Sequence, residues 1–228
     1  MPRSITGKPP TKRQVAAEQT RQKLLRAALE NFSRRPYAAV TVGDIARSAG
    51  VAHGLLSHHF NGKENLYAEV VREISRRLRA ATNITADGST SARLRRHFTA
   101  HLNFLADHED AALNIILRGG EATDLAWETF EAVRHEGTRS ICALLDLDID
   151  EPGLRLAMQG YAAACDEMAR QWLKDGRPLP VEALVDGFMA FLAGAIRAAY
   201  GLAPAPALRQ ALEELDHAAP HRRDTLQA

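Results

Sequence analysis

The apolar residues of this chain recur every three or four positions, which is the spacing that aligns side chains on one face of an α-helix. A first stripe runs from Leu24 to Phe32 and ends before Pro36. A longer stripe predicts a helix from Glu64 to Ala81. No segment alternates apolar and polar residues convincingly, as a half-buried strand would. The pattern therefore predicts an all-α fold.

A polar stretch from Thr85 to Ser91 interrupts this pattern and is the best domain boundary. Further helices are expected after it, because helical spacing resumes there between breaks that contain Gly and Pro. Their predicted ranges are about 92–106, 109–117, 125–145, 154–174, 181–200 and 207–217.

The segment from Thr41 to Phe60 predicts two short helices joined by a tight turn. Thr41 is a suitable N-cap with Asp44 three residues later, and Gly50 supplies the backbone freedom that the turn needs. In the second helix Leu56 and Phe60 are four residues apart, so they can anchor it and leave polar residues outward. This is the layout of a helix-turn-helix, whose second helix enters the major groove of DNA.

The next four residues, Asn61 to Glu64, read as another capping arrangement that opens the long helix. The free N–H groups of its first turn lie beside Lys63 in this prediction. Such a helix start favours an anion, so we expect a DNA phosphate to bind there.

The segment from Thr41 to Leu66 resembles the DNA-binding signature of the TetR family of transcriptional regulators. The matching residues are Thr41, Asp44, Ile45, Ala46, Ala49, Gly50, Val51, Gly54, Leu56, His59, Phe60, Lys63, Glu64 and Leu66. The resemblance implies an all-helical homodimer with an N-terminal DNA-binding domain and a larger C-terminal domain that binds an effector. Two positions depart from the family pattern: Ala52 stands where Ser or Thr is frequent, and Ser57 where an aromatic residue is common.

On this basis we expect five segments. They are a flexible basic arm at 1–16, the helix-turn-helix domain at 17–63, a connecting helix at 64–84, an effector-binding and dimerisation domain at 85–217, and a flexible tail at 218–228.

The distribution of charge supports the same division without any family argument. Residues 1–79 carry 15 Lys and Arg against 6 Asp and Glu, whereas residues 80–228 carry 14 against 22. A net charge of +1 for the whole chain thus conceals a basic N-terminal part and an acidic remainder. A basic part of this kind suits a polyanionic partner, here double-stranded DNA.

The contacts with DNA divide into two groups. Phosphate contacts are expected from Thr41, Arg47, the Gly54 N–H, His59 and Lys63. Base contacts are expected from His53, Leu55, Ser57 and His58.

Two C-terminal helices, near 154–172 and 184–200, have apolar and small residues on more than one face. The resemblance implies that they form a four-helix dimer interface, although a monomeric bundle would explain the same pattern. The interface candidates are Met158, Cys165, Trp172, Phe188, Phe191 and Ala195.

The family analogy also places an effector pocket among the middle helices. Its candidate residues are Phe98, His101, Leu102, Phe104, Leu105, Asn114, Leu117, Arg118, Trp127, Phe130 and Tyr161. A lining of this composition favours a hydrophobic or amphipathic small molecule.

Other functions remain open at this stage. His97 and His101 are four residues apart, so a helical ligand carrier or a metal-dependent enzyme is one alternative, and a DNA-bound activator without an effector is another. A third metal ligand is not evident, and no catalytic motif is visible, so we expect no enzyme, no metal and no cofactor. We also expect a cytoplasmic protein with no membrane partner, with Cys142 and Cys165 as reduced core residues.

Overall fold

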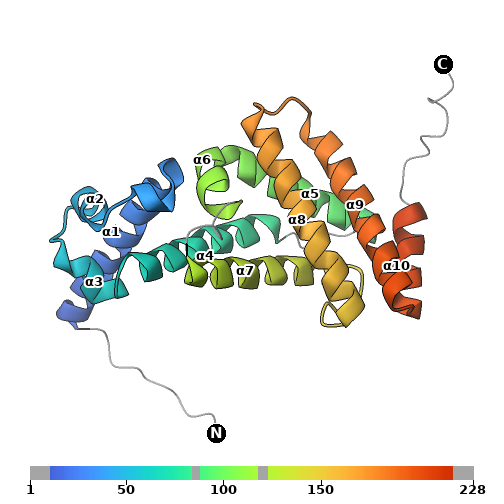
Figure 1. Ribbon diagram of the computed structural model, residues 1–228, viewed down its shortest axis with the longest axis horizontal. Coiled ribbons are helices and arrows are strands. Elements are labelled where there is room, and N and C mark those ends of the chain that lie inside the picture. The colour runs from blue at the N-terminus through green and yellow to red at the C-terminus, as the bar shows by residue number, and fades with distance from the viewer. Residues whose placement is uncertain (1–10, 84–87, 118–122, 218–228) are drawn as a thin grey trace, which may run out of the picture.

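The computed structural model describes residues 11–83, 88–117 and 123–217, and every regular element in these ranges is helical (Figure 1). This confirms the predicted all-α fold. Three helices gather at one end of the molecule: α1 (Lys12–Arg34), α2 (Val42–Ala49) and α3 (Gly54–Phe60). The short turn η1 (Tyr37–Ala39) joins α1 to α2, and α4 (Lys63–Thr82) leads away from this N-terminal head.

The first helix begins earlier than its apolar stripe suggests. Thr11 caps α1: its hydroxyl accepts a hydrogen bond from the Gln14 N–H at 3.3 Å, and the Gln14 side chain accepts one from the Thr11 N–H at 2.8 Å. Residues 12–16, expected in a flexible arm, are therefore helical, since a capping box starts a helix without help from apolar packing. Residues 1–10 lie outside the described part of the chain.

The second part of the molecule contains the remaining helices, close to the predicted ranges. They are α5 (Thr90–Asp107), α6 (Glu109–Ala111), the π-helix η2 (Ala112–Ile116), α7 (Asp124–Ala143), α8 (Pro152–Lys174), α9 (Val181–Leu202) and α10 (Pro206–His217). The single helix expected at 109–117 is divided into α6 and η2, and α7 ends two residues before the predicted limit at 145.

Two hydrophobic cores hold these helices together. The core of the head contains Leu24, Phe32, Ile45, Leu56 and Tyr67, and it also takes in side chains from the C-terminal part. Those additional residues are Phe104, Ala111, Ile115 and Ala126. These residues of the second part therefore share one hydrophobic core with the head and with α4.

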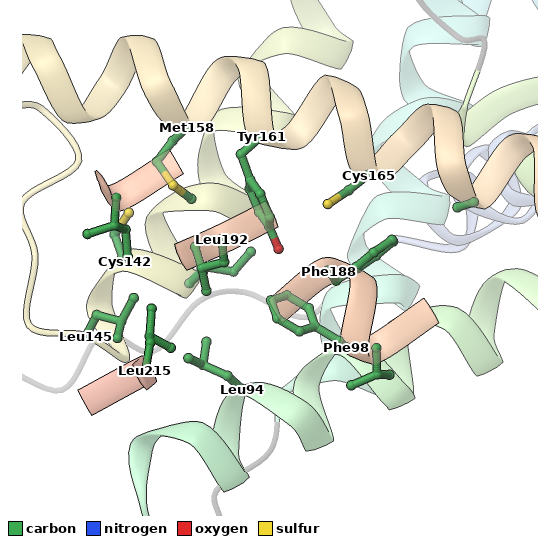
Figure 2. Close-up of a cluster of buried hydrophobic side chains, with 14 of the residues drawn as sticks. Leu94, Phe98, Cys142, Leu145, Met158, Tyr161, Cys165, Phe188, Leu192 and Leu215 are labelled. Atoms are coloured by element: carbon green, nitrogen blue, oxygen red, sulfur yellow. The ribbon is translucent and has the colours of Figure 1, made fainter. Parts of the chain in front are cut away.

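The larger core fills the space among α5, α7, α8, α9 and α10 (Figure 2). Its central side chains include Phe98, Tyr161 and Phe188. Cys142 and Cys165 are buried free cysteines, as the sequence predicted. Among the described residues, no helix is both long and apolar enough to cross a membrane.

Candidate functional sites

The start of α2 is fixed by reciprocal hydrogen bonds between Thr41 and Asp44. The Thr41 hydroxyl accepts from the Asp44 N–H and an Asp44 oxygen accepts from the Thr41 N–H, both at 3.1 Å. The bond from the Thr41 N–H favours the ionised carboxylate and, with a smaller effect of the Thr41 side chain, lowers the pKa of Asp44. Gly50 ends α2 at φ 64°, in the left-handed region that favours glycine. Both features were predicted from the sequence.

Helix α3 presents a polar surface on a short, firmly anchored segment. Leu56 and Phe60 are 0% and 6% exposed, so the predicted anchors are confirmed. His53, Ser57 and His58 are exposed on the other side. Among the other candidates for DNA contacts Thr41 and Gly54 are exposed, while Leu55 and His59 are half-buried.

Arg47 extends from the last turn of α2 with 80% of its side chain exposed. Its guanidinium lies 3.2 Å from Asp44, which also faces Arg35 at 3.4 Å. An ion pair this exposed is weak, so Arg47 is available to another anion.

The N-terminus of α4 differs from the prediction. Asn61 does not cap α4: it ends α3 at φ 56°, with its N–H donating to the Ser57 carbonyl at 2.9 Å. The N-cap of α4 is Gly62, at φ 117° and without a side-chain cap. A left-handed residue is a common way to end a helix, and here two successive residues of positive φ turn the chain sharply from α3 into α4.

Lys63 has an internal role that the sequence did not reveal. Its ammonium donates to the carbonyls of Tyr37 and Val40 at 3.1 and 3.0 Å, and it lies 3.9 Å from the centre of the Tyr37 ring. Burial lowers the pKa of Lys63. The side chain thus ties the start of α4 to the turn between α1 and α2, and its predicted phosphate contact would have to use the remaining N–H.

Helix α4 is joined to the head by further contacts. Arg21 of α1 pairs with Glu69 at 3.0 Å and lies 5.1 Å from the centre of the Phe60 ring. Leu66, Tyr67 and Val70 are fully buried in the head core. A movement of α4 would therefore carry α3 with it.

The other end of α4 forms one wall of a cavity of about 490 Å³. This volume lies within the range of small-molecule sites, about 300–1,000 Å³. Helices α5, α7, α8 and α9 and the π-helix η2 complete the enclosure. Its interior is mainly apolar, with side chains that include Val71, Leu78, Phe98, Ile116, Phe130, Ile141, Leu144, Tyr161, Cys165 and Phe188.

Four of the predicted pocket residues line this cavity: Phe98, His101, Phe130 and Tyr161. The others do not contribute to its lining among the described residues, and Arg118 lies outside those residues. Leu102, Phe104 and Leu105 are packed in the two cores, and Trp127 is 52% exposed. Leu117 is only partly buried against the larger core.

Asn114 connects the two parts of the molecule. Its amide donates to the Ser33 carbonyl at the end of α1 at 2.8 Å. The backbone carbonyl of Asn114 accepts from the Tyr67 hydroxyl at 3.5 Å. Asn114 therefore joins η2 to the head and is not part of the cavity.

The sequence pattern did not predict that α4 contributes to the lining of the cavity. Val71, Ser75, Leu78 and Arg79 all line the cavity. A signal was present, because the apolar stripe of this helix continues well past the residues that pack on the head. A helix that leaves one domain with an apolar face must bury that face in the next one.

Two half-buried histidines line the cavity. The His97 Nδ1 lies 3.2 Å from the Thr82 carbonyl at the end of α4, and burial lowers the pKa of His97. Burial lowers the pKa of His101 to about 4, with a smaller effect of His97. Both rings are therefore neutral near pH 7.

The hydroxyl of Tyr161 is buried, and the only hydrogen-bonding group beside it among the described residues is the thiol of Cys165, which is a weak partner. The side chain is 5% exposed and points into the interior between α8 and α9 (Figure 2). Burial raises the pKa of Tyr161, and the thiol of Cys165 adds to this effect. A buried hydroxyl without a strong partner is unusual, since leaving one unpaired costs about 1–3 kcal/mol.

An ion pair forms the polar wall between α7 and α8. Arg134 donates to one Asp166 oxygen through Nε at 3.1 Å and Nη2 at 2.7 Å, and it also pairs with Glu131 at 3.1 Å. Burial raises the pKa of Asp166, and the guanidinium beside it opposes that shift.

His97 and His101 are not joined by further metal ligands. Among the described residues, no cluster of three His, Cys, Asp or Glu side chains is placed to hold a metal ion.

The structure corrects four of the six predicted interface residues. Met158, Cys165, Trp172 and Phe188 are between 1% and 7% exposed, in the interior of the single chain. Cys165 and Phe188 face the cavity, and the Trp172 indole donates to the Leu179 carbonyl at 2.8 Å. The reason is that α8 and α9 pack tightly against each other and against α5, which takes up these faces.

Phe191 remains 45% exposed, and Ala195 is partly exposed on the same helix. Leu156 on α8 is also exposed, at 62%. These residues are on the surfaces that α8 and α9 leave uncovered, so they are available to a second subunit.

A helix-turn-helix head joined through one helix to a domain with a ligand-sized cavity defines a class, the DNA-binding transcriptional regulators. Comparison with known proteins supports the same class. Residues 24–70 match the family model described as bacterial regulatory proteins, tetR family. The head therefore matches the DNA-binding domain of the TetR family, and the similarity of the chain to TetR-family regulators supports a DNA-binding transcriptional regulator.

Relatives extend the similarity beyond the head. The transcriptional activator FasR of Mycolicibacterium smegmatis is 29% identical over 188 residues, which are 78% of this chain and 84% of FasR. The transcriptional repressor KstR2 of the same organism is 28% identical, over 79% of this chain and 92% of KstR2. A TetR-family regulator from Streptomyces coelicolor has a similar structure, with a TM-score of 0.68 at 29% identity over 86% of this chain and 90% of that one.

Proposed function

We propose that this chain is a homodimeric repressor that binds a palindromic operator and leaves it when a small apolar or amphipathic molecule enters the cavity. One observation carries the proposal: α4 forms a wall of the cavity at one end and belongs to the head core at the other. A ligand that prefers one position of α4 would shift the spacing of two heads. In this proposal residues 17–63 read DNA, 64–84 transmit the signal, and 85–217 bind the effector and dimerise.

The proposal assigns the reading of bases to α3. Its exposed residues Ser57 and His58 face outward while Leu56 and Phe60 anchor the helix, which suits a helix inserted in the major groove. Arg47 and Thr41 are at the ends of α2, where phosphate contacts of a helix-turn-helix are expected.

Selection of binding sites from random DNA tests this assignment. We expect His58→Ala and Ser57→Ala to change the selected sequence, because they remove base contacts. Arg47→Ala should weaken binding to all sequences and reduce the salt slope by about one per head. Identical selected sequences for the wild type and both α3 variants would contradict the proposal.

Dimer formation is proposed through the exposed surfaces of α8 and α9. Phe191→Asp should produce monomers in light scattering, since it places a charge in an apolar interface. Val15→Asp is a matched control, because Val15 is similarly exposed, at 42%, but is on α1 in the head. A wild-type monomer at micromolar concentration, or a dimer that persists in Phe191→Asp, would contradict this part.

The effector site is tested by filling it. Gly137 of α7 lines the cavity, and a Cβ added there meets no atom within 4 Å. Gly137→Leu should therefore place its side chain in the cavity without disturbing the fold. In a thermal-shift screen of apolar and amphipathic compounds, ligands should raise the melting temperature of the wild type but not that of Gly137→Leu.

The matched control is Ala143→Leu, because Ala143 is exposed on the same helix and does not line the cavity. This variant should keep the wild-type response. If ligands stabilised Gly137→Leu as strongly as the control, they would bind elsewhere and the proposed site would be wrong.

The relatives include both an activator and a repressor, and the proposal assigns repression to this chain. We propose that His97 and His101 line a binding site and do not catalyse a reaction, in agreement with relatives that are transcriptional regulators. A regulator of this kind works on chromosomal DNA, so the predicted cytoplasmic location is part of the same proposal.

A further inference from the structure

The polar residues of the cavity are arranged unevenly. Phe98, Tyr161, Cys165 and Phe188 are at most 7% exposed and form the interior. Arg79 is exposed, in the last turn of α4, and also lines the cavity. The cavity therefore has an apolar interior and a basic opening.

Arg93 adds a second charge at this opening. It lies in the first turns of α5, near the end of α4, since the His97 ring one turn later contacts the Thr82 carbonyl. Arg93 is half-buried and lines the same cavity. Among the described residues, neither Arg79 nor Arg93 has a carboxylate partner.

The other charges that line the cavity do not neutralise this pair, and Glu128 and Glu136, which share a neighbouring surface pocket with Arg79, form no ion pair with it among the described residues. Asp166 is the only acidic side chain among the described lining residues, and Arg134 already holds it through two hydrogen bonds. His97 and His101 are neutral near pH 7 because burial lowers the pKa of both. The lining thus carries a net positive charge that is concentrated at Arg79 and Arg93.

A second observation points to an occupant. The buried Tyr161 hydroxyl is directed into the interior and has no stronger partner among the described residues than the Cys165 thiol. A polar atom of a bound molecule would give it a strong partner, whereas an empty cavity leaves it with the thiol alone.

We propose that the effector is an amphipathic anion, with an apolar body among Phe98, Phe188 and Tyr161 and a carboxylate or phosphate end held by Arg79 and Arg93. The fork of a guanidinium matches both kinds of anion, and two such groups at the opening of an apolar cavity select an anionic end over a neutral or cationic one. This inference rests on the proposed effector site and specifies its ligand class.

Four probes with the same ten-carbon chain test the choice of end group: decanoate, decyl phosphate, 1-decanol and decylamine. Binding to the full-length protein without DNA is measured by calorimetry at pH 7, below the concentration at which each probe aggregates. At least one anion should bind about tenfold more tightly than 1-decanol, as expected for a charged hydrogen bond at a partly exposed site. Decylamine should bind more weakly than 1-decanol, because the opening repels it.

Variants identify the residues that produce this preference. Arg79→Gln and Arg93→Gln should each reduce the advantage of the anion severalfold while leaving 1-decanol binding unchanged. Arg76→Gln is the matched control, since Arg76 is exposed on the same helix, pairs with Glu73 and does not line the cavity. It should keep the full preference.

The outcomes separate this inference from the proposed function. If 1-decanol or decylamine binds as tightly as the anions and is blocked by Gly137→Leu, the cavity binds ligands but the charge inference is wrong. If an anion binds more tightly but Arg79→Gln and Arg93→Gln leave that preference intact, these residues are not the anion site and the inference also fails. If no probe binds, the inference of an amphipathic anion fails as well. The wider screen with Gly137→Leu then still decides whether the cavity is an effector site.

Discussion

The Lys63 side chain provides the sharpest prediction about the head, because its observed contacts and its predicted DNA contact lead to different results. Replacing it with Met keeps an apolar stem of similar length but removes the ammonium. Both acceptors of that ammonium, the carbonyls of Tyr37 and Val40, are in the segment between α1 and α2. The substitution should therefore loosen the connection between this segment and α4.

The size of the effect follows from the interactions that the ammonium makes. A hydrogen bond to a charged group contributes about 1.5–3 kcal/mol, and a cation near an exposed aromatic ring about 0.5–1 kcal/mol. The Lys63 side chain is only half-buried, so water can replace part of each interaction. We expect Lys63→Met to reduce the free energy of unfolding by about 2 kcal/mol, which for a chain of this size lowers the melting temperature by about 4–8 °C.

The assay combines thermal unfolding with DNA binding at several salt concentrations. If Lys63 acts mainly inside the head, Lys63→Met binds DNA more weakly while the dependence on salt keeps its slope. Arg47→Ala is the comparison: it should reduce the slope by about one per head with little loss of stability, because its side chain is 80% exposed. A Lys63→Met variant of normal stability with a reduced slope would refute this reasoning and restore Lys63 as chiefly a phosphate contact.

Three further predictions concern backbone strain and buried polar groups. Gly50→Ala should reduce the free energy of unfolding by about 1–2 kcal/mol in urea unfolding, because the backbone of Gly50 is left-handed. Gly160→Ala, at an exposed position in the middle of α8, should be neutral or stabilising, and equal effects of the two changes would contradict this. Since burial holds the pKa values of His97 and His101 below that of an unfolded histidine, the unfolded state binds more protons, and stability should fall as pH drops below about 6.5. For His101 this fall should continue to about pH 4, by up to about 1.4 kcal/mol per pH unit. His101→Gln should reduce that fall, and an unchanged pH dependence would contradict the assignment. Tyr161→Phe loses at most the weak contact with the Cys165 thiol, so its melting temperature should stay the same or rise, and a clear decrease would reveal a stronger partner for the hydroxyl.

Local signals explain how much of the head was predictable. The Thr41 and Asp44 cap, Gly50 and the anchors Leu56 and Phe60 all act within a few residues, so the spacing alone located α2 and α3. Lys63 differs, because its acceptors are 26 and 23 residues earlier in the chain. A partner that only folding brings near leaves no pattern in the sequence.

In the second part of the molecule, the sequence predicted the positions of the helices but not which of their faces are buried. Helices α8 and α9 are apolar on more than one face, so their composition could not show which face meets the core and which stays exposed. Phe188 and Phe191 illustrate the problem: three residues apart on α9, they are 3% and 45% exposed. The cavity depends likewise on how several helices meet, and for that reason the share of α4 in it was missed.

Release of DNA by a ligand tests the central claim most directly. An operator obtained by selection is labelled, and its binding to the wild type and to Gly137→Leu is followed by fluorescence anisotropy as a stabilising ligand is added. The account predicts that the ligand weakens operator binding by the wild type at least tenfold, while the operator affinity of Gly137→Leu stays unchanged. Equal release from both proteins, or a ligand that binds the cavity and leaves operator affinity unchanged, would contradict it.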